Sequence, residues 1–399
     1  MRVFIAGIDG YLGWPLAQYL ASRGHVVAGI DALLRRQWVE EIGGHSAIPV
    51  ATIAERLQAF RRHFGITLDF QNGNLLDYEF LKHSLITFKP DAVVHLAEMP
   101  SAPYSMISQS HAAFTQHNNV IGSLNLLWAI KETCPDAHLI KLGTMGEYGT
   151  PNLDIPEGFF EIEYRGRRDR LPFPRQAGSF YHWSKVHDSN NVMFACHIWK
   201  LRATDIMQGV VFGTRIDDES LEPPLQTRLD FDQCFGTVIN RFCCQAVIGH
   251  TLTVYGRGGQ TRGFLPLRDS MQCLAIAIEH PPDAGEYRVF NQFEQCYNVE
   301  ELAELVQRAG QSIGLDVEVM HFSNPRTELE KHHYNPDRDH LIRLGYRPTH
   351  DIEPEIRSML TDLAHHRARI DAGRHLLIPD IRWDGTRHLS TPITDGEKE

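Results

Sequence analysis

The sequence has few of the features that mark nucleic-acid-binding or membrane proteins. Its 399 residues carry a formal net charge of -11 with 22% charged residues, and its basic clusters run no longer than residues 165–170. That balance argues against a nucleic-acid footprint. No apolar run approaches the length of a transmembrane helix, and the N-terminal apolar strand is too short for a signal peptide. We therefore expect no nucleic-acid partner and no membrane span.

Cysteines are few and show no metal-ligand spacing. The chain has seven, an odd number, and most are set in apolar surroundings. This pattern is typical of reduced core residues in a cytoplasmic protein. The sequence thus predicts no metal site, and its length predicts a sizeable core divided between two structural units.

Strand-like runs alternate with helical periods through the first half of the chain. This alternation predicts an α/β fold, a Rossmann doubly wound parallel sheet with helices on both faces. A stretch rich in proline and glycine, residues 150–180, reads as a loop over the carboxyl edge of the sheet. The expected strands are residues 2–7, 26–31, 66–70, 91–96, 138–142 and 204–212.

A glycine-rich turn follows the first expected strand and opens a helix. Gly7, Gly10 and Gly13 permit a tight turn in which backbone N–H groups approach a pyrophosphate at the helix N-terminus. A lone glycine motif is weak evidence, since unrelated α/β proteins also have such turns. Strand, glycines, helix and second strand occur here in the order that a dinucleotide-binding unit requires.

The end of the second strand favours NAD over NADP. Asp31 can accept hydrogen bonds from an adenosine ribose, which the 2′-phosphate of NADP would prevent. Arg35 and Arg36 lie just past this strand and could instead hold a 2′-phosphate. The sequence therefore predicts NAD and leaves NADP open.

A tyrosine and a lysine four residues apart provide the chemistry. Tyr181 and Lys185 share one face of an expected helix. A nearby ammonium favours phenolate and lowers a phenol pKa that is about 10 in model peptides. Such a phenol can take the proton of a sugar or alcohol hydroxyl while a nicotinamide cofactor accepts the hydride. The spacing is common by chance, so its weight comes from the glycine turn upstream.

The pattern changes beyond Gly213. We assign residues 1–213 to an NAD-binding Rossmann domain, to which the chain returns at about residues 264–292. Residues 214–399 form mainly a smaller mixed α/β substrate domain with a mobile tail after about Leu389. Its expected elements are a helix at residues 234–248, a strand at 252–255 and a helix opened by the capping box at 298–301.

Long strings of the sequence extend these motifs over roughly residues 1–385. They include residues 101–107, 116–120, 141–149, 179–182, 184–189 and 256–263. In these strings the chain resembles the extended short-chain dehydrogenase/reductases that modify nucleotide sugars, and within them the branch of the UDP-sulfoquinovose synthases.

The resemblance implies a mechanism. A retained NAD transiently oxidises the C4 hydroxyl of UDP-glucose or a related UDP-sugar, elimination across C5 and C6 gives an enone, sulfite adds at C6, and the hydride returns to C4. Tyr181 would be the C4 base, Lys185 its partner and ribose ligand, and Thr144 would bond the same hydroxyl. Glu147 and His182 are the candidates for proton transfer at C5 and C6. A structural carboxylate at Glu147 and simple packing of His182 stay open.

The resemblance also implies ligand contacts and a homodimer. Beside the glycine turn, Asp31, Arg35 and Arg36, the cofactor-binding candidates are Asn74, Leu75, Asn118, Asn119 and Gln208. The substrate-binding candidates are Tyr104, Asn240, Arg241, Thr253, Tyr255 and Arg262. Arg262 would bind a diphosphate by charge-assisted hydrogen bonds, unless it is an ordinary surface ion pair.

The chain departs from the synthase pattern at three places. Met99 and Pro100 stand where a Gln-Arg pair is expected, Met207 stands for an asparagine, and Asn74 for an aspartate. The missing arginine would pair with a sulfur oxyanion, and proline offers neither charge nor donor. A nucleotide-sugar 4-epimerase or dehydratase that does not use sulfite is therefore the alternative. A non-catalytic NAD-binding regulator is a third reading, disfavoured because Thr144, Tyr181 and Lys185 are all present.

Overall fold

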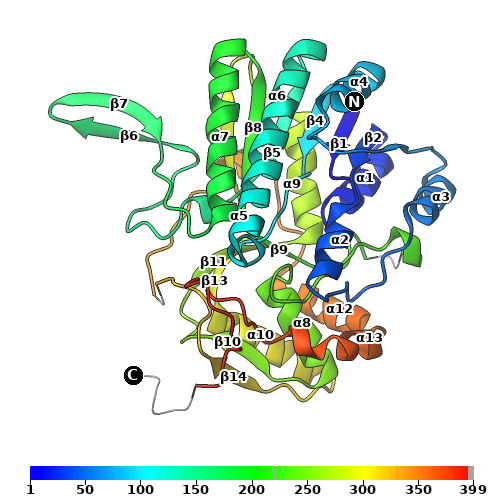
Figure 1. The fold of residues 1–399 in the computed structure, drawn as a ribbon, viewed down its shortest axis with the longest axis vertical. Helices are drawn as coiled ribbons and strands as arrows, with labels where there is room; N and C mark the ends of the chain where they lie inside the picture. Colours follow the sequence, from blue (N-terminus) through cyan, green and yellow to red (C-terminus); the bar gives the residue numbers. More distant parts are fainter. Residues whose placement is uncertain (219–220, 330, 394–399) are drawn as a thin grey trace.

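The computed structural model describes residues 1–218, 221–329 and 331–393, and its centre is a seven-stranded parallel sheet (Figure 1). The strands run in the order β12-β8-β5-β4-β1-β2-β3, so the order reverses between β1 and β4. Their bounds are β1 Arg2–Ala6, β2 Val26–Asp31, β3 Asp69–Asn72, β4 Ala92–His95, β5 His138–Thr144, β8 Arg202–Gln208 and β12 Tyr287–Gln292.

Helices cover both faces of this sheet because its central strands are buried on both sides. Successive strand side chains point to opposite faces, so Val3 and Ile5 of β1 join one core while Phe4 and Ala6 join the other. The first core includes helices α1 Gly13–Ser22, α3 Ile53–Phe64 and α9 Leu267–Glu279. The second includes α4 Tyr78–Phe88, α6 Gly122–Thr133 and α7 Phe180–Trp199. The predicted doubly wound fold is confirmed.

The C-terminal part builds a separate mixed α/β core below the sheet (Figure 1). Two small sheets accompany its helices: β10 Leu252–Tyr255 pairs with β14 Val319–Phe322, and β11 Thr261–Pro266 lies between β9 Val210–Phe212 and β13 Gln295–Asn298. The helices are α8 Val238–Ile248, α10 Val299–Ser312, α12 Ile352–Ala364 and α13 Arg367–Ala372. Asn298 and Glu301 form the predicted capping box of α10. The position of the domain boundary stays a prediction.

The expected sixth strand is in fact two strands in different sheets. β8 ends at Gln208 in the central sheet, and β9 pairs with β11 in the smaller one. Gly209 lies between them, and a Cβ there would meet the Gly263 carbonyl oxygen at 2.6 Å. The close approach of two backbones thus brings the two sheets together at the carboxyl end of β8.

Other differences are local. The expected loop at residues 150–180 contains an antiparallel hairpin, β6 Phe159–Tyr164 and β7 Arg167–Pro172, which projects from the body (Figure 1). Helix α8 starts at Val238 because Asp232 accepts hydrogen bonds from the Cys234 and Phe235 N–H groups ahead of it. The remaining helices are α2 Leu34–Glu41, α5 Gln109–Gln116, a π turn at His117–Ile121 and α11 Asp339–Arg343.

The expected mobile tail is partly described. Ser390 donates to the Pro379 carbonyl and Ile393 to the His321 carbonyl, so the segment up to Ile393 is hydrogen-bonded to the body. The rest of this prediction, residues 394–399, lies outside the described residues. Within the described ranges, none of the helices has the length and apolar character needed to span a membrane.

Candidate active site

A cavity of about 860 Å³ lies at the carboxyl ends of the central strands. Its wall includes Gly7 after β1, Leu96 after β4 and Thr144 at the end of β5, and the C-terminal part contributes Arg241 and Tyr255. Ligands of open α/β sheets bind at such strand ends, where the strand order reverses. The cavity wall is therefore built by both the central sheet and the C-terminal part of the protein.

The glycine turn forms one end of this cavity. Gly7 has a φ of +89°, and a Cβ there would meet the Leu96 carbonyl carbon at 2.6 Å. A Cβ on Gly13 would meet the Gly7 carbonyl oxygen at 2.1 Å. Side chains at these positions would break the turn, so the backbone lies bare against the cavity at the start of α1. This geometry fits a dinucleotide pyrophosphate.

Asp31 lies at the end of β2 on the cavity wall. Its carboxylate accepts hydrogen bonds from the Asp9 N–H at 2.9 Å and the Leu33 N–H at 2.7 Å. Burial raises the pKa of Asp31 to about 6, with the charge of Asp9 adding to the rise. A fixed carboxyl group at this point fits a ribose hydroxyl donor.

The two arginines that left NADP open are both engaged by carboxylates. Arg35 lies 2.7 Å from Asp230 and stacks on the Phe235 ring with its guanidinium 3.8 Å from the centroid. Arg36 donates to both carboxylate oxygens of Asp9 at 2.8 Å. Their charges are neutralised, which favours NAD over a cofactor with a 2′-phosphate. Arg35 lines the cavity, and Arg36 lies behind it.

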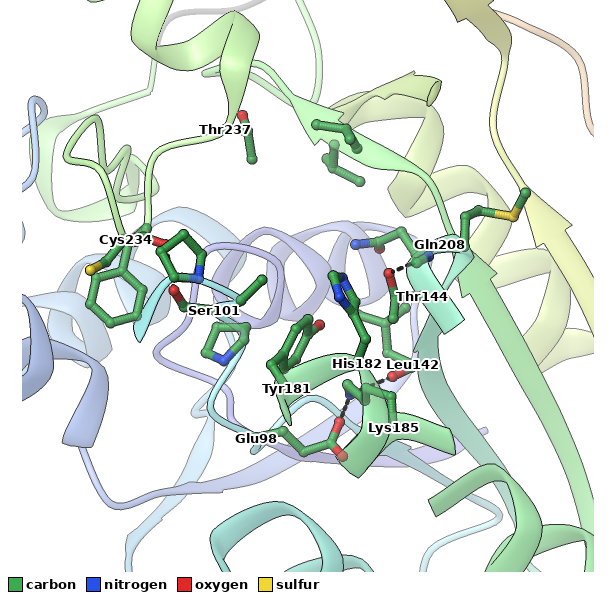
Figure 2. Close-up of a pocket in the computed structure, with 18 of the residues that line it drawn as sticks. Glu98, Ser101, Leu142, Thr144, Tyr181, His182, Lys185, Gln208, Cys234 and Thr237 are labelled. Atoms are coloured by element: carbon green, nitrogen blue, oxygen red, sulfur yellow. Dashed lines mark hydrogen bonds and ion pairs between the residues drawn. The ribbon is translucent and has the colours of Figure 1, made fainter. Parts of the chain in front are cut away.

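Thr144, Tyr181, His182 and Lys185 converge on the middle of the cavity (Figure 2). Thr144 comes from the end of β5, and the other three come from the first turns of α7. Helix α7 starts there because the Ser179 hydroxyl accepts a hydrogen bond from the His182 N–H, a standard N-cap. The structure therefore brings together four of the five residues predicted to be catalytic.

The ammonium of Lys185 is directed differently from the sequence-based expectation. It donates to the Leu142 carbonyl at 2.7 Å and forms an ion pair with Glu98 (Figure 2). Burial lowers the pKa of Lys185 to about 8. Burial also raises the pKa of Tyr181 well above its usual value, and the charges of Glu147 and Asp188 add to that rise. The predicted lowering of the phenol pKa by Lys185 is not seen in this structure, because desolvation is the largest effect on the phenol.

The fifth predicted residue, Glu147, lies behind the wall. It is completely buried, ion-paired with Lys141 at 3.4 Å and with Arg175, and it accepts a hydrogen bond from Ser189 at 3.0 Å. Burial raises its pKa against the opposing charges of Lys141 and Arg175. These contacts are those of the structural carboxylate that the sequence left open.

His182 lines the cavity and is held by its other ring nitrogen. Nδ1 lies 2.9 Å from the Ser179 hydroxyl, which leaves Nε2 toward the cavity side near Gly146. Burial lowers the pKa of His182 to about 3, with the charges of Arg326 and Arg262 adding to the effect. The imidazole is therefore neutral at physiological pH.

The other ligand candidates divide into two groups. Those on the cavity wall are Asn74, Leu75, Asn118, Gln208, Arg241, Tyr255 and Arg262. Tyr104, Asn119, Asn240 and Thr253 are buried and do not line it. Asn119 holds both backbone groups of Met99, Tyr104 donates to Glu41, and Thr253 bonds Gln245. Each of these three side chains is used within the protein.

Arg241 is a buried cation on the part of the cavity wall that comes from the C-terminal part. It donates to the Thr253 carbonyl at 3.2 Å and stacks 4.3 Å from the centroid of Tyr255, while its Nε has no hydrogen-bond partner. Burial lowers its pKa. Arg262 is half-buried, forms an ion pair with Glu328 at 3.0 Å and also lines the cavity. A buried arginine beside an aromatic ring fits a nucleotide with its phosphates.

Only one of the two apolar departures reaches the wall. Pro100 lines the cavity, whereas Met207 is fully buried behind it with its sulfur 3.8 Å from Arg175. Met207 therefore does not reach the cavity, because its side chain is buried on the other side of β8.

Sequence reasoning missed three residues of the site. Glu98 comes shortly after β4, which ends at His95, and its place beyond a strand end is a signal that could have identified it. Trp383 reaches the cavity wall and Arg175 reaches Glu147 behind it, both from distant segments that no local pattern marks. Among the described residues, no cluster of three or more His, Cys, Asp or Glu side chains is placed to hold a metal ion.

Comparison with known proteins agrees with this geometry. The profile of the NAD dependent epimerase/dehydratase family matches residues 3–291. The UDP-sulfoquinovose synthase of Sulfolobus acidocaldarius is 47% identical over 384 residues, which cover 96% of this chain and 98% of that protein. The chloroplastic UDP-sulfoquinovose synthase of Spinacia oleracea is 47% identical over 382 residues, covering 96% and 79%.

Solved structures share the fold at low sequence identity. The UDP-glucose 4-epimerase of Thermotoga maritima, solved with UDP-glucose, gives a TM-score of 0.68 at 18% identity and covers 92% of this chain and 100% of that one. The UDP-glucuronic acid 4-epimerase of Bacillus cereus, solved with UDP-glucuronic acid and NAD, gives 0.68 at 18%, covering 92% and 99%. Sequence, fold and cavity agree: the chain belongs to the NAD dependent epimerase/dehydratase family, in the branch of the UDP-sulfoquinovose synthases.

Proposed function

We propose that the protein is a UDP-sulfoquinovose synthase that acts on UDP-glucose. The observation that carries this proposal is the convergence of Thr144, Tyr181, His182 and Lys185 on one cavity, which also holds the glycine turn and a buried arginine. Oxidation of the C4 hydroxyl makes the C5 hydrogen acidic, the C6 hydroxyl leaves, and sulfite adds to C6 of the resulting enone. Bound NAD supplies the hydride acceptor for the first step and the hydride donor for the last.

Tyr181 removes the proton of the C4 hydroxyl as its phenolate, a form that the ammonium of Lys185 favours against the effect of burial. Thr144 holds that hydroxyl in place. Both side chains line the same cavity on neighbouring elements (Figure 2). Lys185 provides the positive charge next to them and one N–H donor for a cofactor ribose. Gly7, Gly13 and the Asp31 carboxyl support the cofactor at the other end of the cavity.

We assign the proton transfers at C5 and C6 to His182 in preference to Glu147. His182 lines the cavity as a neutral imidazole, the form that can accept a proton. Glu147 is enclosed by Lys141, Arg175 and Ser189 and has no exposed surface. A group that must reach a sugar carbon needs the access that only His182 has.

Arg241 and Tyr255 bind the nucleotide part of the substrate. The unused Nε of Arg241 and its stacked, buried guanidinium suit a diphosphate oxygen. Arg262 also lines the cavity, and it binds the diphosphate in place of its ion pair with Glu328. Asn240 in α8 and Thr253 in β10, two further substrate-binding candidates, lie behind the wall and support it by packing.

The use of sulfite is the step that separates the two candidate functions. Pro100 on the cavity wall favours a second candidate, a 4-epimerase or dehydratase that takes no anionic nucleophile. Incubation of the purified protein with UDP-glucose, with and without sulfite, separates the candidates by mass analysis. A sulfonated sugar nucleotide supports the synthase, a dehydrated or isomerised sugar supports the second candidate, and NAD binding without turnover supports a regulator.

We infer that the protein is a homodimer through helices α6 and α7. The outer surface of these helices exposes Trp128, Trp183, Phe194 and Ile198, of which Phe194 is 60% exposed. Such a patch of large apolar side chains is unusual on a monomer. We also propose a cytoplasmic location, because all seven cysteines are free thiols, as is usual in a reducing compartment. Sedimentation of the protein and of Phe194→Glu tests the dimer: the variant should sediment as a monomer, and equal values for both would remove this interface.

A further inference from the structure

The carboxylate of Glu98 lies inside the catalytic cavity in contact with the ammonium of Lys185. The chain leaves β4 at His95, and Leu96, Ala97 and Glu98 line the cavity directly afterwards. The side chains of Glu98 and Lys185 are 3% and 4% exposed. Figure 2 shows Glu98 and the Leu142 carbonyl both joined to the same ammonium.

Two of the other buried carboxylates near Lys185 are engaged by Lys141, and a third, Asp188, interacts with both lysines. Asp205 and Glu147 each lie 3.4 Å from Lys141, the second buried lysine of the site. Asp188, on the same helix as Lys185, raises the pKa of Lys185, as does Asp205. Tyr181 is uncharged in this setting, because burial raises its pKa.

His95 does not compete for the Glu98 carboxylate. Its Nε2 is 3.9 Å from Glu98 and bonds the Ser123 hydroxyl at 2.9 Å. Burial and the charges of Lys185 and Lys141 hold the pKa of His95 well below its usual range, so the imidazole is neutral. Glu98 therefore has Lys185 as its cationic neighbour among the described residues.

Burial favours the neutral amine form of Lys185 over its ammonium form. An amine that loses its water is easier to deprotonate, and desolvation lowers the pKa of Lys185 to about 8. A carboxylate in contact opposes that loss, because it stabilises the ammonium. An ammonium has three donors; Leu142 and Glu98 take two of them, and the third remains for a ligand in the cavity.

We propose that Glu98 is a positioning residue for catalysis, which keeps Lys185 charged and fixes its ammonium between the Leu142 carbonyl and the cavity. It acts through Lys185 and does not touch the sugar. The inference rests on the proposed function for the role of Lys185, but its first test needs neither substrate nor turnover.

The first test follows the titration of Lys185 directly. The chain has eight lysines, so lysine-selective isotope labelling gives few side-chain NMR signals, and Lys185→Arg identifies the one that matters. In Glu98→Gln the titration midpoint of Lys185 should fall by about 1 pH unit or more. Lys141 is the internal control and should titrate as before, since its carboxylates are untouched. An unchanged midpoint for Lys185 would overturn the proposal.

The second test follows cofactor reduction by UDP-glucose across pH. Loss of the ammonium should stop the reaction at high pH. The alkaline limb of the pH–rate profile of Glu98→Gln should therefore have its midpoint about 1 pH unit below that of the wild type. Glu98→Asp keeps the charge and should restore part of the difference. Glu355→Gln is the matched control, because Glu355 is also buried and ion-paired, at 2.6 Å from Arg268, but lies in α12. Equal alkaline limbs in the wild type and Glu98→Gln would contradict a role through Lys185.

Discussion

The imidazole of His182 occupies the space that a side chain at Gly146 would need. A Cβ built on Gly146 would lie 2.4 Å from Nε2 and 2.5 Å from Cδ2 of His182. Gly146 is in the short turn after β5, and His182 is in the first turn of α7. The glycine is therefore what allows the histidine to lie beside Thr144 in the cavity.

Gly146→Ala should displace His182 while leaving the phenol in place. Gly146 does not have a positive φ, so the backbone accepts alanine and the imidazole must move. We expect C4 oxidation to persist and elimination at C5 and C6 to slow by about 10²-fold or more, the usual cost of a lost acid–base group. Solvent-deuterium exchange at C5 measures this step. Gly122→Ala, whose Cβ would make an ordinary 3.5 Å contact with Leu75, should exchange normally; equal exchange in both variants would remove His182 from the step.

Tyr181→Phe should abolish cofactor reduction and keep nucleotide-sugar binding. The ring stays and only the hydroxyl is lost, so the cavity keeps its shape. We expect a fall in the reduction rate of about 10²- to 10⁴-fold, with a UDP-glucose affinity by calorimetry close to that of the wild type. Normal reduction of the cofactor by this variant would mean that another group is the base.

His182 should make stability fall faster as the pH is lowered. Burial lowers its pKa to about 3, below the value of about 6.5 expected in the unfolded chain. The unfolded state therefore takes up a proton first, and stability present above about pH 6.5 is lost as the pH falls toward 3. Denaturant unfolding at about pH 7.5 and pH 5 should show a larger loss for the wild type than for His182→Gln. Equal losses would mean that His182 titrates normally.

Pro100→Arg should improve the use of sulfite. Pro100 lines the cavity near Ser101 and Ala102, and an arginine there would add the cation that an oxyanion prefers. We expect the KM for sulfite to fall several-fold while the rate of C4 oxidation is unchanged. An unaltered sulfite response would show that the anion is held by other cations, such as Arg326 on the same wall.

The sequence predicted the parts of the site that depend on local pattern. The glycine turn, Asp31 and the Tyr181–Lys185 pair are each set by residues close together in the chain, and all line the cavity. The direction in which a side chain points within a turn could not be predicted from local pattern. Thr144 and Glu147 are three residues apart, yet one faces the cavity and the other is enclosed by Lys141 and Arg175.

Local sequence patterns could not predict the contacts between segments that are far apart in the chain. The Trp383 indole N–H donates to the Gly178 carbonyl at 2.9 Å, across 205 residues of sequence, and closes one side of the cavity. The pairing of Glu98 with Lys185 likewise depends on β4 lying next to β5 and on α7 packing over β5 and β8. These contacts follow from strand order, which periodicity alone does not give.

The most direct test of the account uses UDP-glucose that carries deuterium at C4. The labelled substrate is mixed with the NAD-loaded protein without sulfite, the protein is denatured, and the released cofactor is analysed by mass. The account predicts reduced cofactor bearing one deuterium. In a parallel sample that receives sulfite before denaturation, it predicts a sulfonated sugar with the deuterium back at C4. Release of fully oxidised, unlabelled cofactor beside a converted sugar would contradict it, because the reaction would then proceed without hydride transfer at C4.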